Sequence, residues 1–366
     1  MKFRCERDVL VEALGTATRA VASRGGALPV LSGVKAELDG DRLSLTGSDL
    51  DLTIQVGVTV AGQRDGVAVL PARLTADIVR SLAAGAVHVD AEGDEARISS
   101  GRSEFSVRLL PAEDFPRLPE TPGDEVTLEA EAFAEALKQV VRAASHDDAR
   151  PILTGVLMAA EGDGLRLVAT DSYRLAVRDL RGTTVLREGQ TVLVPSKALG
   201  ELTRVLAGAE SVTLRLAERD ATFVVGETRL TTRLIEGDFP NYEQLIPSGY
   251  PNKLTVKRDV IHAAVERVRL VGQGRDTAPI RLAMTAQGLE LSAVAQDVGE
   301  AHESVEAKYE GADLTVAFNS QFLLEGIEAA GAAEVVVESI DPLKPAVLRG
   351  TDNADYLYLL MPVRIS

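Results

Sequence analysis

The chain repeats itself three times, and this repetition constrains the fold more than any other feature of the sequence. Residues 28–49 return without a gap as residues 150–171, so that Leu-Pro-Val-Leu-Ser-Gly-Val matches Arg-Pro-Ile-Leu-Thr-Gly-Val. A weaker third copy runs from Pro279 to Ala293. A period of about 120 residues exceeds the roughly 20 to 50 residues of a solenoid repeat, so each copy is expected to be a whole domain.

The copies also end alike. The segment from Leu109 to Pro116 matches that from Leu234 to Pro240, and the segment from Leu360 to Val363 begins in the same way. Residues that stop regular structure are concentrated at 119–124 and 247–252, which we interpret as linkers. The sequence therefore predicts three domains, over residues 1–121, 125–247 and 252–366.

Hydrophobic periodicity predicts an α+β fold with antiparallel sheets, in which each copy has two helices. Apolar residues alternate with polar ones from Leu50 to Val60, which is typical of a half-buried strand. Further strands are expected at 212–216, 222–225 and 334–337, with turns at Glu92-Gly93-Asp94 and Glu161-Gly162-Asp163-Gly164. Apolar spacings of three and four predict helices at 6–22, 72–83, 130–145, 196–207, 258–271 and 320–330.

Composition limits the compartment and the partners. A single cysteine, Cys5, excludes an intramolecular disulfide, and no signal peptide or long apolar run is found, so we expect a cytoplasmic protein without membrane segments. The net charge of −16 argues against general affinity for nucleic acid. Any contact with DNA therefore requires a locally basic surface.

Two of the copies carry such a surface at matching positions. Arg73 and Arg80 lie seven residues apart, which is two helical turns with a drift of only ~20°, and Lys197 and Arg204 repeat this spacing. Burial of the leucines on these helices, with Leu74 among them, would turn the basic pairs outward. The alternative for each pair is an ordinary solvated helix face. In the third copy Gln321 and Glu328 replace the pair, so the basic surface is uneven.

Taken together with the repeats, several longer motifs identify a family. The most specific are Ala-Thr-Asp-Ser-Tyr-Arg-Leu-Ala-Val at 169–177, Glu-Gly-Asp-Phe-Pro-Asn-Tyr at 236–242 and Met-Pro-Val-Arg at 361–364. With these, the whole chain resembles the bacterial sliding clamps, the β subunits of DNA polymerase III. The resemblance implies a DNA clamp fold: a head-to-tail homodimer closed into a ring around duplex DNA, with helices inside and sheets outside, on which the replicative polymerase and the clamp loader dock.

The resemblance also assigns roles to individual residues. The implied DNA-facing residues are Arg24, Arg73, Arg80, Lys197 and Arg204. The implied dimer interface joins Phe105 and Val107 of one chain to Leu270 and Val271 of the other. The implied pocket for partner peptides comprises Leu153, Thr170, Tyr173, Arg174, Leu175, Pro240, Leu245, Phe322, Pro345, Val347, Leu359, Met361, Pro362, Val363 and Arg364. Val107 and the apolar pocket members could equally be core residues.

Sequence motifs for catalysis are weak. Ser145-His146-Asp147 contains the residue types of a catalytic triad, but neighbours in sequence do not converge as a triad must. The four histidines and one cysteine lack the spacing of metal ligands, and no glycine-rich phosphate-binding motif is complete, so no cofactor or metal is expected. Two rival hypotheses stay open: an enzyme built around Asp147-Asp148, and a scaffold that binds only proteins.

Overall fold

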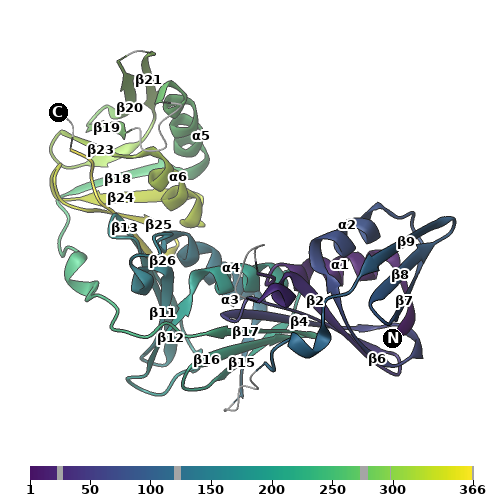
Figure 1. Ribbon diagram of the computed structural model, residues 1–366. Helices are drawn as coiled ribbons and strands as arrows, with labels where there is room; N and C mark the ends of the chain where they lie inside the picture. Colours follow the sequence, from purple (N-terminus) through teal and green to yellow (C-terminus); the bar gives the residue numbers. More distant parts are fainter. Residues whose placement is uncertain (23–27, 119–124, 273–278, 297, 365–366) are drawn as a thin grey trace. The chain divides into compact units, whose positions relative to one another are not determined.

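The computed structural model describes residues 1–22, 28–118, 125–272, 279–296 and 298–364, and it is built of helices and antiparallel sheets (Figure 1). All six expected helices are confirmed, with ends two to five residues shorter than expected in several cases because the last turns are irregular or 3₁₀. They are α1 (Arg7–Thr18), α2 (Ala72–Ser81), α3 (Ala130–Val140), α4 (Ser196–Val205), α5 (Arg258–Val268) and α6 (Ser320–Ala329). The 3₁₀ turns are η1 (Pro29–Ser32), η2 (Ala112–Asp114), η3 (Val141–Ala143), η4 (Pro151–Thr154), η5 (Glu243–Leu245) and η6 (Arg269–Gly272).

The strands recur in the same order in each copy. The first copy contributes β1 (Lys2–Glu6), β2 (Gly33–Asp39), β3 (Arg42–Ser48), β4 (Leu52–Thr59), β5 (Ala61–Arg64), β6 (Gly66–Pro71), β7 (Ala86–Glu92), β8 (Glu95–Ser100) and β9 (Ser103–Arg108). The second contributes β10 (Glu125–Glu129), β11 (Gly155–Glu161), β12 (Gly164–Thr170), β13 (Arg174–Leu180), β14 (Thr191–Pro195), β15 (Ser211–Leu216), β16 (Asp220–Val225) and β17 (Thr228–Arg233). The third contributes β18 (Asn252–Lys257), β19 (Pro279–Thr285), β20 (Gly288–Ala295), β21 (Gly299–Val305), β22 (Lys308–Glu310), β23 (Leu314–Asn319), β24 (Glu334–Ser339), β25 (Ala346–Gly350) and β26 (Asn353–Leu360).

Local sequence explains these strands. Leu52, Ile54 and Val56 of β4 are buried, whereas Thr53 and Gln55 between them are partly exposed, which confirms the expected alternation within β4. Leu50, which was expected to begin this strand, is 41% exposed and lies in the turn before it, so that part of the expectation is wrong. The turns that join β7 to β8 and β11 to β12 contain Gly93 and Gly162 with φ values of 61° and 56°. Two-residue hairpin turns require such left-handed backbone, which glycine adopts without strain.

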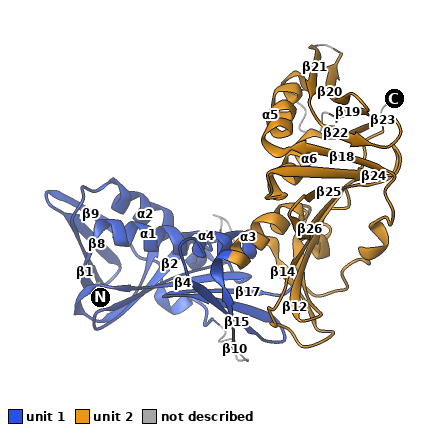
Figure 2. Cartoon of the chain, turned by 180° about the vertical axis from the view of Figure 1, so that it is seen from behind, with its two compact units in different colours: residues 1–131, 197–234 blue, residues 132–196, 235–366 orange. Residues whose placement is uncertain are grey.

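The chain forms two compact units (Figure 2). Residues 1–131 and 197–234 make the first unit, and residues 132–196 and 235–366 make the second. The middle copy is divided between them because its strands join two different sheets. The three expected domains are defined by the sequence repeat, whereas the two units are defined by contacts between residues. The division into three domains therefore stays a prediction.

Copies are joined edge to edge inside each unit. In the first unit an eight-stranded sheet has the order β10-β15-β16-β17-β4-β3-β2-β6, in which β17 of the second copy pairs with β4 of the first. In the second unit a nine-stranded sheet has the order β14-β11-β12-β13-β26-β25-β24-β18-β22, in which β13 pairs with β26 of the third copy. We call these pairings the first seam and the second seam.

Two smaller sheets end in strands that no other strand of the described chain extends. The five-stranded sheet β5-β1-β7-β8-β9 ends at β9, and the four-stranded sheet β21-β20-β19-β23 ends at β21. By position in the repeat, β9 corresponds to β17 and β26, and β21 corresponds to β4 and β13. The two edges are therefore the counterparts, in the repeat, of the strands that form the first and second seams.

The helices cover one face of their sheets with an apolar stripe. Leu199, Leu202 and Leu206 on and just after α4 are buried, as expected. Leu74 of α2 was expected to be buried and is 52% exposed, so that expectation is wrong. Residues four apart on a helix differ in direction by roughly 40°. The buried stripe of α2 is centred on Thr75 and Val79, so Leu74 lies outside the edge of that stripe.

Candidate functional site

The four predicted basic residues in the described part of the chain lie on exposed helix faces of the first unit. Arg73 and Arg80 project from α2, and Lys197 and Arg204 project from α4. In Figure 1 both helices lie on the same side of the eight-stranded sheet. Arg24 lies outside the described residues. The predicted positions thus share one side of one sheet, although each pair alone is also compatible with ordinary solvated helix surface.

Three of the four cations already have carboxylate partners. Arg80 lies 3.0 Å from Asp77, and Arg204 lies 2.8 Å from Glu201, three residues earlier on each helix. Lys197 lies 2.7 Å from Asp49. The cations of all three pairs are largely exposed, and ion pairs screened by water in this way contribute only ~0.2–1 kcal/mol, so the cations remain available to a phosphate at little cost.

All fifteen predicted pocket residues fall within the second unit, and the second seam supplies their centre. Leu175 of β13 stands opposite Leu359 of β26, and both pack with Val168, Val177 and Val347 in one buried cluster. Tyr242 and Ile246, which flank Leu245, pack against this cluster. These contacts bring segments from the second and third copies together, while their role as a peptide pocket stays a prediction.

The pocket residues divide by exposure. The buried members are Leu153, Thr170, Arg174, Leu175, Val347 and Leu359. The half-buried members are Phe322, Pro345, Pro362 and Val363. The exposed members are Tyr173, Pro240, Leu245, Met361 and Arg364. In this conformation Leu175, Val347 and Leu359 are core residues, as the alternative interpretation has it. A ligand would therefore contact the exposed and half-buried members first.

Tyr173 and Met361 form the accessible apolar part of this site. The amide of Met361 donates a hydrogen bond of 2.9 Å to the carbonyl of Tyr173, which fixes the two residues side by side. Tyr173 is 60% exposed and Met361 36% exposed. A large aromatic ring and a flexible thioether left in contact with water are suited to an apolar peptide side chain.

A tight turn positions Tyr173. The Asp171 carboxylate accepts hydrogen bonds from the amides of Tyr173 (2.9 Å) and Arg174 (3.0 Å), and Ser172 between them has a φ of 80°. The first copy has the same turn, in which Asp49 accepts from the amides two and three residues later and Leu50 also has a φ of 80°. The repeated sequence thus encodes a repeated, strained turn at both seams.

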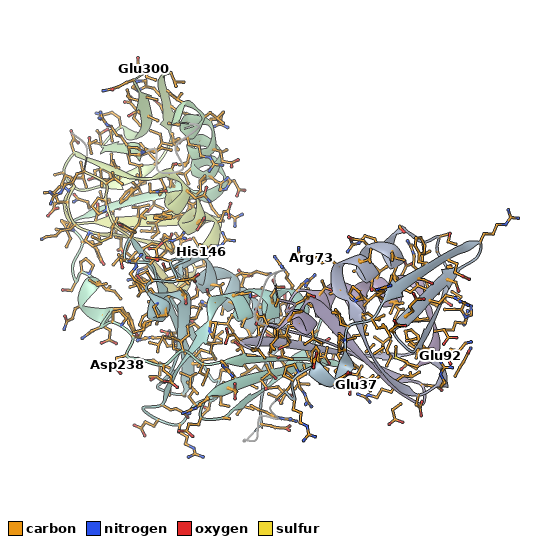
Figure 3. The ribbon with its side chains drawn as sticks, viewed as in Figure 1. Glu37, Arg73, Glu92, His146, Asp238 and Glu300 are labelled. Carbon is orange, nitrogen blue, oxygen red and sulfur yellow. The ribbon has the colours of Figure 1, made fainter. Side chains whose placement is uncertain are left out.

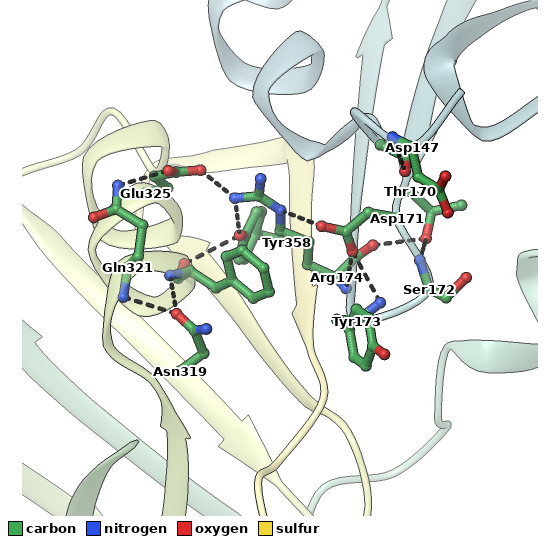
Figure 4. Close-up of polar contacts among 12 residues, drawn as sticks. Asp147, Thr170, Asp171, Ser172, Tyr173, Arg174, Asn319, Gln321, Glu325 and Tyr358 are labelled. Carbon is green, nitrogen blue, oxygen red and sulfur yellow. Dashed lines mark hydrogen bonds and ion pairs between the residues drawn. The ribbon is translucent and has the colours of Figure 1, made fainter. Parts of the chain in front are cut away.

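Arg174 does not face the solvent but ties this turn to α6 (Figure 4). Its Nε lies 3.0 Å from Asp171 Oδ2, its Nη1 forms an ion pair with Glu325, and its guanidinium stacks 4.2 Å from the centre of the Phe322 ring. Burial by itself would lower the pKa of Arg174, but interactions with Tyr358 and Glu325 outweigh burial, so the pKa is raised and the group stays charged.

The sequence did not predict Asp171, Glu325 or Tyr358 as site residues. Tyr358 is fully buried, and its hydroxyl donates a 3.0 Å hydrogen bond to the carbonyl of Phe322. Asp171 belongs to a motif that was noticed, whereas Glu325 gave no signal, because only the fold brings α6 next to β13. Arg174 is therefore a positioning residue that connects two predicted pocket members, Tyr173 and Phe322.

The predicted dimer residues differ in exposure. Phe105 on β9 and Leu270 on η6 are exposed, at 37% and 53%. Val271 is half-buried. Val107 is buried within its own unit, opposite Ala96 of β8, which favours its alternative role as a core residue.

No catalytic arrangement emerges around residues 145–148. The amide of Asp147 donates to Ser145 Oγ (3.1 Å), and the Asp147 carboxylate accepts from Ala149 and Arg150. The Ala149 amide, and then Arg150, lower the pKa of Asp147, which indicates a structural turn. Among residues 1–22, 28–118, 125–272, 279–296 and 298–364, no group of three or more His, Cys, Asp or Glu side chains could hold a metal ion. None of the helices in that part of the chain has the length and hydropathy that crossing a membrane requires.

Comparison with known proteins accounts for the entire chain. Residues 1–119, 127–241 and 243–364 match the N-terminal, central and C-terminal domains of DNA polymerase III beta subunits. The beta sliding clamp of Streptomyces coelicolor is 37% identical over 378 residues and that of Staphylococcus aureus is 31% identical over 376, each match covering 100% of this chain and at least 99% of the relative.

Solved structures agree with these relatives. The DnaN sliding clamp of Pseudomonas aeruginosa, solved bound to griselimycin, has a TM-score of 0.92 at 30% identity. The DNA polymerase sliding clamp of Bacillus subtilis has a TM-score of 0.91 at 28% identity. Both comparisons cover 100% of each chain.

Proposed function

The chain belongs to the DNA polymerase III beta subunit family, the bacterial sliding clamps, and from that premise we propose how its own residues carry out the function. Two copies close head to tail into a ring around duplex DNA. The ring tethers the replicative polymerase and other proteins that act on DNA, so that they do not dissociate between steps. It is a processivity factor and not an enzyme, and it acts in the cytoplasm.

The observation that carries the proposal is the pattern of seams. Within each unit, copies are joined by pairing an edge strand of one with an edge strand of the next, β4 with β17 and β13 with β26. Among the residues that the structure describes, the equivalent edges β9 and β21 have no such partner. Unpaired edges expose backbone donors and acceptors to further pairing. When β9 of each chain pairs with β21 of the other, a third seam forms twice and no edge of this kind remains.

Enclosure explains why an acidic protein can work on DNA. A duplex inside a closed ring cannot leave sideways, so weak, salt-sensitive contacts with phosphate are sufficient. Arg73, Arg80, Lys197 and Arg204 supply these contacts from the helix side of the first unit. The Debye length of ~8 Å at physiological salt screens distant carboxylates from the phosphates.

Partner proteins insert a short peptide with apolar anchors at the second seam. Tyr173, Met361 and Leu245 are the accessible anchoring residues, and the cluster around Leu175 lies beneath them. An apolar site edged by a few polar groups is suited to such a ligand. The exposed tyrosine and methionine support this assignment.

The ring is tested by topology. The protein is loaded by the clamp loader on nicked circular DNA, isolated by gel filtration, and the DNA is then cut once. We expect the protein to stay with circular DNA and to be lost after linearisation, because a ring slides off a free end. Retention on linear DNA would show adhesion, and would support the rival hypothesis of a binding scaffold without enclosure.

A further inference from the structure

The two seams have opposite chemistry on the sheet face that points away from the helices. At the second seam, Leu175 stands opposite Leu359 in the strand ladder, and this position is apolar. At the first seam, the repeat places Thr53 at the position of Leu175, and Thr53 stands opposite Thr231. The centre of the first seam is therefore polar, whereas the centre of the second seam is apolar.

The outward face of the first seam is hollowed into a groove. A cavity of about 420 Å³ and an adjoining one of about 390 Å³ share Gln55 and Arg229. Gln55 and Arg229 are themselves opposite each other in the ladder between β4 and β17. The two cavities thus form one continuous feature along the seam, which we call the first-seam groove.

The groove is positively charged in a chain whose net charge is −16. Two of its cations are neutralised by neighbouring carboxylates, Lys35 by Glu37 at 2.8 Å and Arg42 by Glu227 at 2.6 Å. Its other two cations, Arg117 and Arg229, are exposed and form no ion pair with any residue that the structure describes. The groove therefore presents two uncompensated positive charges.

One wall of the groove is a fixed segment. Phe115 is buried against Val30 and Leu31, and the Lys35 ammonium lies 5.8 Å from the centre of its ring. Pro116 and Arg117 follow directly and line the cavity. In the repeat, Phe115-Pro116 corresponds to Phe239-Pro240, which borders the second seam. The same scaffold thus forms a recess beside both seams.

We propose that the first-seam groove binds a short acidic peptide of a partner protein, and so forms a second docking site with the opposite selectivity to the apolar one. Arg117 and Arg229 pair with two carboxylates of the peptide. The hydroxyls of Thr53 and Thr231 accept hydrogen bonds from its backbone amides or donate them to its carbonyls. Because the protein carries a net charge of −16, such a peptide is repelled by most of its surface. The groove and the basic helix face of α2 and α4 are the exceptions, and the helix face is occupied by the duplex in the proposed ring.

Position favours a peptide over nucleic acid. Figure 3 shows Glu37, which lines the groove, on the side of the sheet opposite to Arg73 and the helices. The proposed ring holds its duplex on the helix side, so the DNA does not reach the groove. The inference rests on the proposed function in this one respect, that partner peptides bind at seams.

The test uses the full-length protein and two fluorescein-labelled probes, an octapeptide with the central sequence Asp-Glu-Asp-Glu and its Asn-Gln-Asn-Gln counterpart. Fluorescence anisotropy measures binding to the wild type, to the double variant Arg117→Glu with Arg229→Glu, and to Arg219→Glu. Arg219 is an exposed arginine of the same unit that does not line the groove, so Arg219→Glu is the matched control. A thermal melt of each variant checks folding.

We expect the acidic probe to bind the wild type at least about tenfold more tightly than the amide probe, and the double variant to lose about tenfold, while Arg219→Glu changes binding by less than about twofold. Equal losses in the double variant and the control would overturn the proposal. So would equal binding of both probes, or an oligonucleotide that displaces the acidic probe more effectively than unlabelled acidic peptide does.

A third probe separates this inference from the proposed function. A peptide with leucine and phenylalanine anchors should bind the second seam of the wild type and of the double variant alike. If that peptide binds and the acidic probe does not, the groove assignment fails alone. If the acidic probe behaves as expected and the apolar peptide binds nowhere, the proposed second-seam site fails and the groove stands.

Discussion

Arg174 Nε lies 3.0 Å from Asp171 Oδ2, and this ion pair is buried at the turn that presents Tyr173. The same guanidinium reaches Glu325 on α6, so one cation serves two carboxylates from two copies of the repeat. The second seam is therefore held by backbone pairing between β13 and β26 and by a charge network that joins the turn before β13 to α6.

Replacing Arg174 with methionine should destabilise the protein by about 3–5 kcal/mol, because it leaves the carboxylates of Asp171 and Glu325 buried without a cation. The midpoint of urea unfolding measures this. Arg181→Met is the matched control, since Arg181 is largely exposed and its partner Asp355 stays in contact with water, and it should cost less than about 1 kcal/mol. Equal losses of stability in the two variants would contradict a stabilising role of the network formed by Arg174, Asp171 and Glu325.

Met361→Ala should weaken binding of an apolar-anchored peptide by about fivefold or more, with little change in stability, because Met361 is an exposed contact residue and not part of the core. Isothermal titration calorimetry gives the affinity. Leu343→Ala removes another exposed apolar side chain of the same unit and should leave the affinity unchanged. A loss in both variants would indicate a general effect.

Neutralising the basic helix face should reduce the salt dependence of DNA association. Each phosphate contact contributes about −0.9 to the slope of log K against log salt. Alanine at Arg73, Arg80, Lys197 and Arg204 should therefore make the slope less steep, by the contribution of up to about four phosphate contacts. The control substitutes alanine at four exposed arginines outside the helix faces: Arg97, Arg181, Arg219 and Arg233. An identical slope in wild type and helix-face variant would reject the assignment.

Dimerisation should depend on the exposed residues beside the open edges. Phe105→Ala combined with Leu270→Ala should shift the sedimenting species from two chains toward one, because apolar area is lost from the interface twice per ring. Leu50→Ala with Leu343→Ala removes exposed apolar side chains that lie on neither open edge nor on a strand beside one, and should leave a dimer. An unchanged dimer in the first variant would exclude Phe105 and Leu270 from the interface.

Glu328 should make stability depend on pH at the acid end. Burial by itself would raise its pKa, but hydrogen bonds from Arg142 (2.7 Å) and His262 (3.1 Å) outweigh burial and lower it. A lowered pKa in the folded state gives stability that is complete above the unfolded value of ~4.3 and is lost as the pH falls through the folded value. Melting temperatures of wild type and Glu328→Gln should therefore differ at pH 7 and converge toward pH 3. A constant difference across this range would contradict the assignment.

The sequence by itself determined the elements and their repetition. Six helices, the alternating strands and the glycine turns at Gly93 and Gly162 all follow from local periodicity and from the conformational preferences of single residues. The same local signals located the motifs that identify the family. Each of these features depends on residues a few positions apart, which is why they could be predicted.

Tertiary structure decided which of these residues remain accessible. Leu74 points to solvent although its spacing fits a buried stripe, and Val107 is buried although its strand is an edge. Arg174 is enclosed because Glu325, about 150 positions later, is brought beside it. The contrast between the polar first seam and the apolar second one also appears only when strands of different copies are paired. Burial and charge neutralisation depend on residues distant in sequence, and only the folded chain brings them together.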